Sequence, residues 1–412
     1  MNRFIKVAAA AALTGCLASP SLAVEIDYWQ YTFKGRVDAI DALIEQFEAA
    51  NPDITVNHSH FPYADYRTKV AAAIPAGEGP DVVQLFYGWL EDYIEAGLIK
   101  PLPADRFDPA KIDEDYYPIV QAMKRDGAYM ALPTAVRSLA LFYNKRLLDK
   151  AGVSVPTTLD ELVDASKAIV ERDGSGNLLV AGMTFGMTAQ DHHWWREVLT
   201  RQFGGQPYSE DNTEVTYLDN GGIEALNWYV DMIDGHEVGA VGFMDEPQAA
   251  FKASRAGFHI DGSFRLGALR DQRGLEWGVA ELPSHNGVQS NFSSYWVNGV
   301  TSKAEGEKLE AAYKFLEFLT SDEAMQLWVE TVGELPAKPS AALTEANLEN
   351  EEYGPFIRGL EYAHTTVFAE ESAQRQGMVD ALDRVLLEGM SVEDSLAAAA
   401  AAEQELLDKV NQ

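Results

Sequence analysis

Strand-like and helix-like segments alternate over residues 25–97, and this alternation limits the fold more than any other feature of the chain. The sequence predicts strands over 25–31, 54–56 and 82–86, separated by helical patterns over 37–47 and 65–74. Short extended segments that alternate with helices indicate βαβ units and a parallel sheet. Because such crossovers are right-handed, the carboxyl ends of the strands meet along one edge, where α/β folds bind ligands.

A second strand signal comes from the stretch ALPTAVRSLALFYNK at residues 131–145. Eight nearly continuous apolar residues, 136–143, follow the loop proline Pro133, and Asn144 ends the run. The pattern predicts a strand that starts after the proline and is buried on both faces. Arg137 is the one charge inside it. Because a buried charge is costly when it is unpaired, we expect Arg137 to meet an ion-pair partner or a ligand.

The N-terminus reads as an export signal. Residues 1–23 combine a basic start, a short apolar core over 7–13 and a small-x-small cleavage site that ends at Ala23. A competing interpretation is a bacterial lipobox, in which Cys16 is lipidated and becomes the first residue. Either interpretation predicts a protein outside the cytoplasm, in the periplasm for cleavage at Ala23. Cys16 is the only cysteine, so no disulfide is expected.

Charge and motif content exclude several classes of function. The chain has 32 basic and 64 acidic residues, a net charge of −32, which argues against nucleic acid and against anionic lipid as partners. Motifs of serine hydrolases, P-loop proteins, dinucleotide-binding folds and zinc proteases are missing, so neither catalysis nor a cofactor is predicted. His58 and His60 offer two metal ligands without a third, and we predict no metal site.

Aromatic residues are the feature of the sequence that points to a kind of ligand. The chain has eight tryptophans, and several fall at predicted strand ends or loops: Trp29, Trp89, Trp194, Trp195 and Trp296. Each alone fits a hydrophobic core equally well. Together, aromatic faces beside polar side chains suit a sugar, whose C–H faces stack on rings while its hydroxyls need hydrogen bonds. His192 and His193 are adjacent on a predicted helix, which would direct their rings apart.

Seven short motifs occur in a fixed order along the chain. They are Gly77–Val83, Glu95–Ile99, Leu132–Pro133 with Tyr143–Lys145, Pro156–Leu162, Phe258–Ser263, Ala312–Leu316 and Gly333–Pro336. In this order, and behind an export signal, they make the chain resemble the extracellular solute-binding proteins of ABC importers, the family 1 group that includes maltose-binding protein. The resemblance covers the chain from Val24 to its C-terminus.

The resemblance implies an α/β fold of the periplasmic-binding-protein type II, with two lobes, three hinge crossings and a ligand cleft between the lobes. The crossings are expected near 135–137, 292–295 and 337–340. One lobe would comprise 24–135 and 293–337, and the other 136–292 and 338–412. The strand over 136–143 would then start at the hinge, with Arg137 on the cleft floor. The implied partners are a carbohydrate and the membrane permease of the importer, with the binding protein itself a monomer.

The resemblance also implies a set of ligand contacts. They are Trp29, Gln30, Tyr31, Gln84, Tyr87, Arg137, Trp194, Gly262, Ser263, Phe264, Trp296 and Arg375. Two family contacts, a tryptophan and an aspartate, fall here on Leu85 and Gly88, and a late aromatic falls near Arg375. These departures disfavour maltodextrin and bring an acidic sugar into consideration. A polyol, a glycerophosphodiester and a polyamine remain alternatives as ligands, and a secreted carbohydrate-active enzyme remains an alternative as a class.

Overall fold

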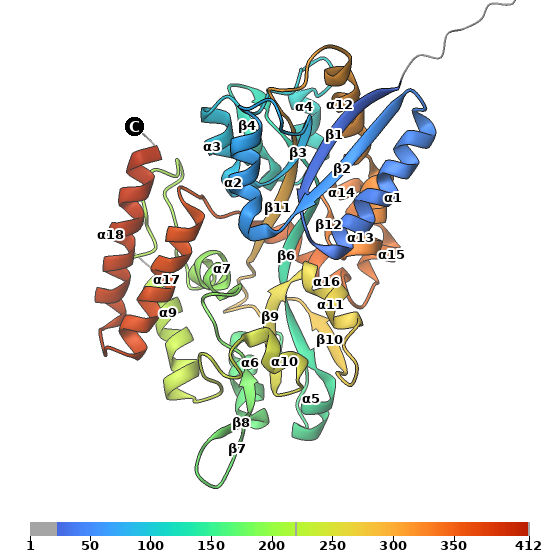
Figure 1. The fold of residues 1–412 in the computed structure, drawn as a ribbon. Coiled ribbons are helices and arrows are strands. Elements are labelled where there is room, and N and C mark those ends of the chain that lie inside the picture. The colour runs from blue at the N-terminus through green and yellow to red at the C-terminus, as the bar shows by residue number, and fades with distance from the viewer. Residues whose placement is uncertain (1–22, 219–220, 411–412) are drawn as a thin grey trace, which may run out of the picture.

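The computed structural model describes residues 23–218 and 221–410, so all but the last residue of the signal peptide predicted over 1–23, including Cys16, lies outside the described residues. One long, mixed sheet runs through the molecule, with helices packed around both of its ends (Figure 1). Its strand order is β2-β1-β3-β11-β6-β9-β8-β7. We call the end that holds β2, β1 and β3 the first lobe, and the end that holds β9, β8 and β7 the second lobe.

The first lobe confirms the predicted parallel sheet. β1 (Val24–Tyr31) pairs in parallel with β2 (Ile54–Phe61) and with β3 (Val82–Phe86). The helices and short strands of this lobe are α1 (Lys34–Ala50), α2 (Tyr63–Ala73), η1 (Tyr87–Trp89), α3 (Leu90–Glu95), α4 (Pro109–Asp115), η2 (Pro118–Met123), β4 (Lys124–Arg125), β5 (Ala128–Tyr129), α12 (Gly306–Leu319) and α13 (Asp322–Val332). α14 (Pro339–Ala342) and α15 (Glu345–Leu348) follow α13, and α14 packs on α13 although the sequence assigned residues 338–412 to the other lobe. The carboxyl ends of β1 and β3 therefore share one edge.

The strand expected over 136–143 is longer than predicted. β6 runs from Leu132 to Asn144, and Pro133 lies inside it instead of before it. The register against β11 (Asn291–Val300) shifts at this point, so that Pro133 faces Val297 and Ala135 faces Trp296. The bulge leaves Thr134 outside the ladder, and the interrupted hydrogen bonding beside it accommodates Pro133, which cannot donate a hydrogen bond. The expectation that the strand starts at the hinge is therefore wrong.

The crossing lies within β6. The strand pairs with β11 up to Ser138 and with β9 (Ala256–Gly262) from Leu139 onward. The short strand β12 (Leu335–Pro336) also pairs with β6, at Val136. β11 and β12 both pair with β6 at this residue, which brings together the first two expected crossing segments and the short strand that directly precedes the third. The exact lobe boundaries remain a prediction.

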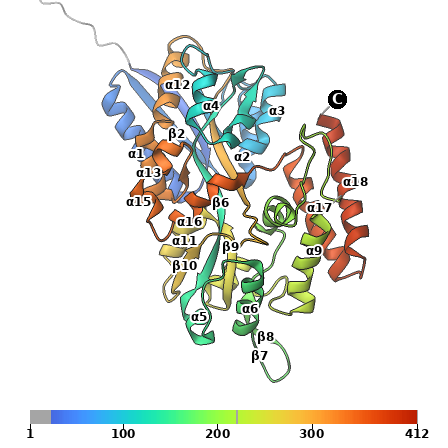
Figure 2. The same cartoon turned by 180° about the vertical axis from the view of Figure 1, so that it is seen from behind.

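The second lobe surrounds the other end of the sheet. Its strands β8 (Leu178–Met183) and β9 are parallel, and α17 (Glu371–Leu386) and α18 (Val392–Val410) pack beside α9 (Gly222–Val230) (Figure 2). The other elements are α5 (Lys145–Ala151), α6 (Leu159–Ile169), β7 (Glu171–Arg172), α7 (Asp191–His193), η3 (Trp194–Leu199), α8 (Thr200–Gln202), η4 (Asp231–Gly235), α10 (Pro247–Lys252), η5 (Ser263–Arg265), α11 (Leu266–Arg270), β10 (Trp277–Ala280), α16 (Gly354–Arg358), η6 (Gly359–Tyr362) and β13 (Ala363–His364).

The molecule has two large hydrophobic cores. One surrounds Ile26, Val83 and Phe315 in the first lobe and continues along the crossing strand to Phe142 and Phe251, and the other surrounds Leu162, Trp194 and Leu382 in the second lobe. Two cores joined by continuous strands are the architecture of a two-lobed type II binding-protein fold. Among residues 23–218 and 221–410, no helix has the length and apolar character needed to cross a membrane.

Candidate functional site

A cavity of about 230 Å³ lies between the two lobes at the crossing strands. Its lining comes from both lobes, and we call it the interlobe cavity. The lining residues are Tyr31, Phe33, Tyr63, Phe86, Arg137, Gln190, His192, His193, Phe264, Ser294, Trp296, Glu371 and Arg375.

The first lobe contributes an aromatic wall. Tyr31 stands at the end of β1, Phe86 at the end of β3 and Trp296 on β11. The rings of Tyr31 and Trp296 are 4.2 Å apart between centroids, and those of Phe86 and Trp296 are 5.8 Å apart. Tyr63, at the start of α2, lies 5.5 Å from Tyr31 and continues the wall. Trp89 packs edge-on behind Trp296 at 5.3 Å.

The indole nitrogen of Trp296 is buried and lacks a hydrogen-bond partner in the described part of the chain. A buried donor without a partner costs free energy, so the wall is incomplete without an acceptor. A sugar hydroxyl supplies such an acceptor while its ring covers the aromatic faces.

The second lobe faces this wall with polar side chains. Gln190, His192 and His193 come from the turn and helix at α7, and Glu371 and Arg375 come from the first turns of α17. Burial lowers the pKa of His192 to about 3, and the positive charges of Arg196 and Arg375 add to the effect. The imidazole is therefore neutral near pH 7, with one nitrogen to donate and one to accept.

The two histidines do not point apart, which corrects the expectation from the sequence. Their ring centroids are 3.8 Å apart, and both line the interlobe cavity. The reason is local: α7 is a single turn that continues into the π-helix η3. His193 also stacks on Phe292 of β11, at 3.8 Å with ring planes 11° apart.

Arg137 occupies the floor of the cavity and is paired, as expected for a charge in a buried strand. Its Nε donates to Oε1 of Glu334 at 2.6 Å, and its Nη2 donates to the hydroxyl of Tyr31 at 3.4 Å. The guanidinium also lies 5.0 Å from the ring centroid of Phe264, which comes from the second lobe. Arg137 thus contacts both lobes and the segment that enters β12.

Five residues from the expected set of ligand contacts line the cavity: Tyr31, Arg137, Phe264, Trp296 and Arg375. Gly262 contributes indirectly, since a β-carbon at that position would lie 2.3 Å from the ring of Phe264. The ligand-binding role of all of them remains a prediction.

Six other expected contacts lie elsewhere. Trp194 is fully buried in the core of the second lobe, 5.7 Å edge-on from Trp228. Gln30 follows the strand alternation to the opposite face from Tyr31, where its Nε2 is 3.0 Å from Nε2 of His58. Trp29 is half-buried and packs on Phe61, and Gln84 and Ser263 are buried. The hydroxyl of Tyr87 donates to the carbonyl of Thr366.

The expected set omitted several lining residues. Tyr63 follows the end of β2, so the strand-end rule that selected Tyr31 also applied there. Glu371 stands four residues before Arg375 on one helix, a spacing that pairs their charges. Oε1 of Glu371 and Nη1 of Arg375 are 3.7 Å apart. No comparable signal marked Gln190, His192 or Ser294.

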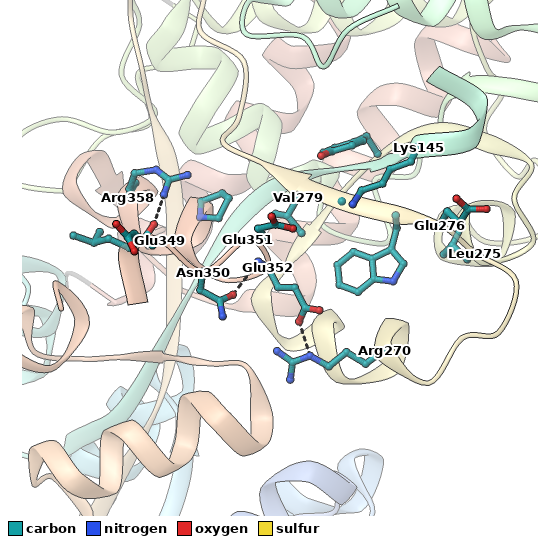
Figure 3. A pocket seen from close by; sticks show the side chains of 15 residues that line it. Lys145, Arg270, Leu275, Glu276, Val279, Glu349, Asn350, Glu351, Glu352 and Arg358 are labelled. Carbon is teal, nitrogen blue, oxygen red and sulfur yellow. Dashed lines mark hydrogen bonds and ion pairs between the residues drawn. The ribbon is translucent and has the colours of Figure 1, made fainter. Parts of the chain in front are cut away.

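A larger hollow of about 870 Å³ lies away from the interlobe cavity, between β10, the end of β6 and residues 348–358 (Figure 3). Both arginines of its lining are already bonded to other groups of the protein. Arg270 Nε donates to Glu352 at 2.6 Å, and Arg358 Nη1 donates to the carbonyl of Leu348 at 2.7 Å. We therefore place the candidate site in the interlobe cavity.

Comparison with known proteins gives relatives of one kind. A maltotriose-binding protein of Pyrococcus abyssi is 26% identical over 372 residues, covering 87% of this chain and 76% of the relative. The GacH receptor of Streptomyces glaucescens, solved unliganded and with acarbose, is 25% identical with a TM-score of 0.79, covering 94% of this chain and 99% of the receptor. The cyclic α-maltosyl-1,6-maltose binding protein of Arthrobacter globiformis has a TM-score of 0.81 at 24% identity, over 94% of this chain and all of the other.

The sequence pattern of one family, described as bacterial extracellular solute-binding protein, matches residues 42–353. With that match over most of its length and a two-lobed fold around an interlobe cavity, the chain belongs to the bacterial extracellular solute-binding protein family.

Proposed function

We propose that this protein is the substrate-binding component of an ABC importer, which captures a sugar or oligosaccharide in the interlobe cavity and delivers it to the membrane permease. One observation carries the proposal: an aromatic wall that contains Tyr31 and Trp296 faces a polar wall that contains Gln190 and His192. Sugars have this dual character, since one face of the ring is apolar and its rim carries hydroxyls.

Closure of the lobes follows from the same geometry. A ligand that contacts Trp296 and His192 together interacts with both lobes only when these are close, so it shifts the population toward the closed form. The closed form then presents both lobes to the permease. We further propose that the predicted export signal directs the protein to the periplasm and that it acts there as a monomer.

The cavity supports binding without catalysis. A glycosidase needs two carboxylates roughly 5–9.5 Å apart beside the scissile bond. Among the described residues that line the cavity, Glu371 is the single carboxylate. Glu334, which lies behind Arg137, already accepts from Arg137 and from the indole nitrogen of Trp328.

An acidic sugar is a second candidate, favoured by the charges around the cavity. Arg36 and Arg137 share the carboxylate of Glu334, and Arg375 is paired with Glu371. Three guanidinium groups against two carboxylates leave one positive charge in excess. This excess favours an anionic ligand and disfavours a polyamine, because like charges repel in a poorly solvated site.

A melting screen of the mature protein against neutral sugars, uronates, polyols and polyamines tests the proposal. A ligand at about 100 times its dissociation constant adds roughly 2.7 kcal/mol to the free energy of unfolding. We expect stabilisation by sugars or uronates. Stabilisation by polyamines alone would contradict the proposal, and so would conversion of a bound sugar to product by the protein alone.

A further inference from the structure

Two neighbouring strands place a pair of polar side chains on the floor of the interlobe cavity. Arg137 of β6 stands directly opposite Ser294 of β11 in the antiparallel register, so both side chains leave the sheet on the same face. Both residues line the cavity. Strand alternation sends Phe292 and Trp296 to this face as well, and Phe292 stacks on His193 of the polar wall. The floor therefore lies between the polar wall and the aromatic wall.

The floor offers hydrogen-bond donors that the protein itself leaves unused. Arg137 donates from Nε to Glu334 and from Nη2 to Tyr31, and its Nη1 has no hydrogen bond in the described part of the chain. Ser294 is only 8% exposed, and its hydroxyl forms no hydrogen bond with any described residue. Because enclosed polar groups are nearly always hydrogen-bonded, these two groups need a partner that enters the cavity.

The floor also carries one positive charge in excess. Within the described residues Arg137 pairs with Glu334 alone, and the same carboxylate pairs with the buried Arg36. The guanidinium of Arg36 lies behind the aromatic wall, 4.8 Å from the ring centroid of Tyr31. The ring of Phe264 covers the guanidinium of Arg137 at 5.0 Å. A positive charge that is poorly solvated attracts an anion more strongly than one exposed to water does.

The side of the cavity at α17 has a different character. The side chain of Glu371 is 12% exposed, and its carboxylate lies 3.7 Å from Nη1 of Arg375, which is longer than a hydrogen bond. The oxygens of Glu371 therefore keep their capacity to accept from hydroxyl groups. Because Arg375 balances the charge of Glu371, this side has no excess positive charge to hold an acid group. Donors and acceptors are thus sorted along the cavity.

We propose that the floor of the interlobe cavity is a carboxylate subsite, in which Nη1 of Arg137 and the hydroxyl of Ser294 bind the acid group of a uronate. The aromatic wall then covers the sugar ring, and the ring hydroxyls face Glu371 and Gln190. The inference rests on the proposed function and deepens it, because the acid group decides the choice of ligand. Ser294 is the residue that selects for this group together with Arg137.

Titration calorimetry with matched pairs of ligands tests the subsite. Each sugar acid is compared with the neutral sugar of the same ring: galacturonate with galactose, glucuronate with glucose, and digalacturonate with α-1,4-linked galactobiose. For the ring that fits the cavity, the wild-type protein should bind the acid about tenfold or more tightly than the neutral partner. The reason is that hydrogen bonds between a guanidinium and a carboxylate are stronger than those to a neutral hydroxyl.

Ser294→Ala isolates the contribution of the hydroxyl. Arg137 and its charge remain, so the affinity for the acid should fall about tenfold, whereas that for the neutral partner should change by less than about twofold. Ser293→Ala is the matched control. The hydroxyl of Ser293 is also buried without a partner in the described chain, but strand alternation puts it on the opposite face of β11. This control should bind both ligands as the wild type does.

Ser294→Asp changes the sign of the test. The new side chain places a carboxylate on the floor itself, where it neutralises the excess charge and repels the acid group of the ligand. We therefore expect the preference to reverse, so that the neutral sugar binds more tightly than the acid. Circular dichroism and thermal unfolding verify that all three variants are folded.

The possible outcomes distinguish this inference from the proposed function. Wild-type protein that binds the neutral sugar as tightly as the acid would overturn the carboxylate subsite and leave the sugar-binding function intact. So would folded Ser294→Ala and Ser294→Asp proteins that keep the wild-type preference for the acid. Absence of binding by every sugar and sugar acid, in these pairs and in the melting screen, would contradict the proposed function, and the subsite with it.

Discussion

Arg137 donates from Nε to Oε1 of Glu334 at 2.6 Å, and this pair joins the crossing strand β6 to the residue that precedes β12. Arg36 of the first lobe contacts the same carboxylate oxygen, and the indole nitrogen of Trp328 donates to the other at 2.9 Å. The side chains of Arg36 and Glu334 are only 1% and 4% exposed. Glu334 is therefore the shared counter-charge of two guanidinium groups at the point where the lobes join.

Replacing Glu334 by glutamine should destabilise the protein by about 3 kcal/mol or more. The substitution preserves shape but leaves the guanidinium groups of Arg36 and Arg137 close together without a counter-charge, and breaking a buried pair typically costs about 3–5 kcal/mol. Urea unfolding measures the change. The exposed pair of Arg67 with Asp92 supplies the control, since Asp92→Asn should cost less than about 1 kcal/mol. Equal effects of the two substitutions would show that Glu334 has no special role.

Arg137→Ala should separate binding from stability. Because Arg36 and Trp328 still contact Glu334 in this variant, the free energy of unfolding of the apo protein should fall by only about 1 kcal/mol. The affinity for the ligand found in the melting screen should fall about tenfold, because a donor is lost from the cavity floor. Calorimetry and urea unfolding measure the two quantities. A large loss of stability with unchanged affinity would make Arg137 a structural ion-pair partner only.

Trp296→Phe should weaken binding while changing the apo protein little. The variant keeps an aromatic face toward Tyr31 but removes the buried N–H that has no partner in the described chain. If that N–H donates to the ligand, its loss should cost about 1–1.5 kcal/mol, or roughly tenfold in affinity. Trp277→Phe, in the larger hollow, is the matched control and should bind as the wild type does. An unchanged affinity in Trp296→Phe would show that Trp296 acts only through its ring.

The first-lobe sheet was predictable because the parallel βαβ pattern depends on local periodicity. β1, β2 and β3 appear where strand-like segments alternate with helical ones. The start of β6 was not predictable, since the bulge that admits Pro133 depends on its pairing with β11, which is distant in sequence.

The strand pattern predicted the lining residues that stand at strand ends or on the crossing strand, whereas Arg375 on α17 was predicted only through the family resemblance. Tyr31 and Arg137 are of the first kind. The placement of Trp194 in the cleft was wrong because position on a helix does not tell which side faces the core. In addition, a π-helix replaces the regular helical turn there. The place of His192 in the cavity depends on tertiary packing between segments that no local pattern relates.

The stability of the protein should depend on the ionisation of His192. In the unfolded chain an imidazole has a pKa of about 6.5, whereas burial lowers the pKa of His192 to about 3 in the folded protein. Between these values the unfolded chain binds more protons. The contribution of His192 to stability is therefore fully present above about pH 6.5 and is lost as the pH falls toward about 3, by about 1.4 kcal/mol per unit.

His192→Gln isolates this contribution, because neighbouring groups also titrate and partly cancel in the wild type. Burial lowers the pKa of His193 well below its usual range, which acts in the same direction. Burial raises the pKa of Asp191 to about 6, so the contribution of that carboxyl is lost as the pH rises from about 4 to 6, the opposite direction. Both remain in the variant, so the difference in unfolding free energy between variant and wild type reports His192 alone.

Urea unfolding at about pH 6.5, 5.5 and 4.5 measures this difference. The unfolding free energy of the variant should increase relative to that of the wild type by about 1.4 kcal/mol for each unit by which the pH is lowered. The exposed His60, replaced in the same way, controls for the loss of a surface histidine. Parallel stability profiles for His192→Gln and wild type would mean that His192 takes up its proton as readily in the folded protein as in the unfolded chain, and that the polar wall is far better hydrated than its burial indicates.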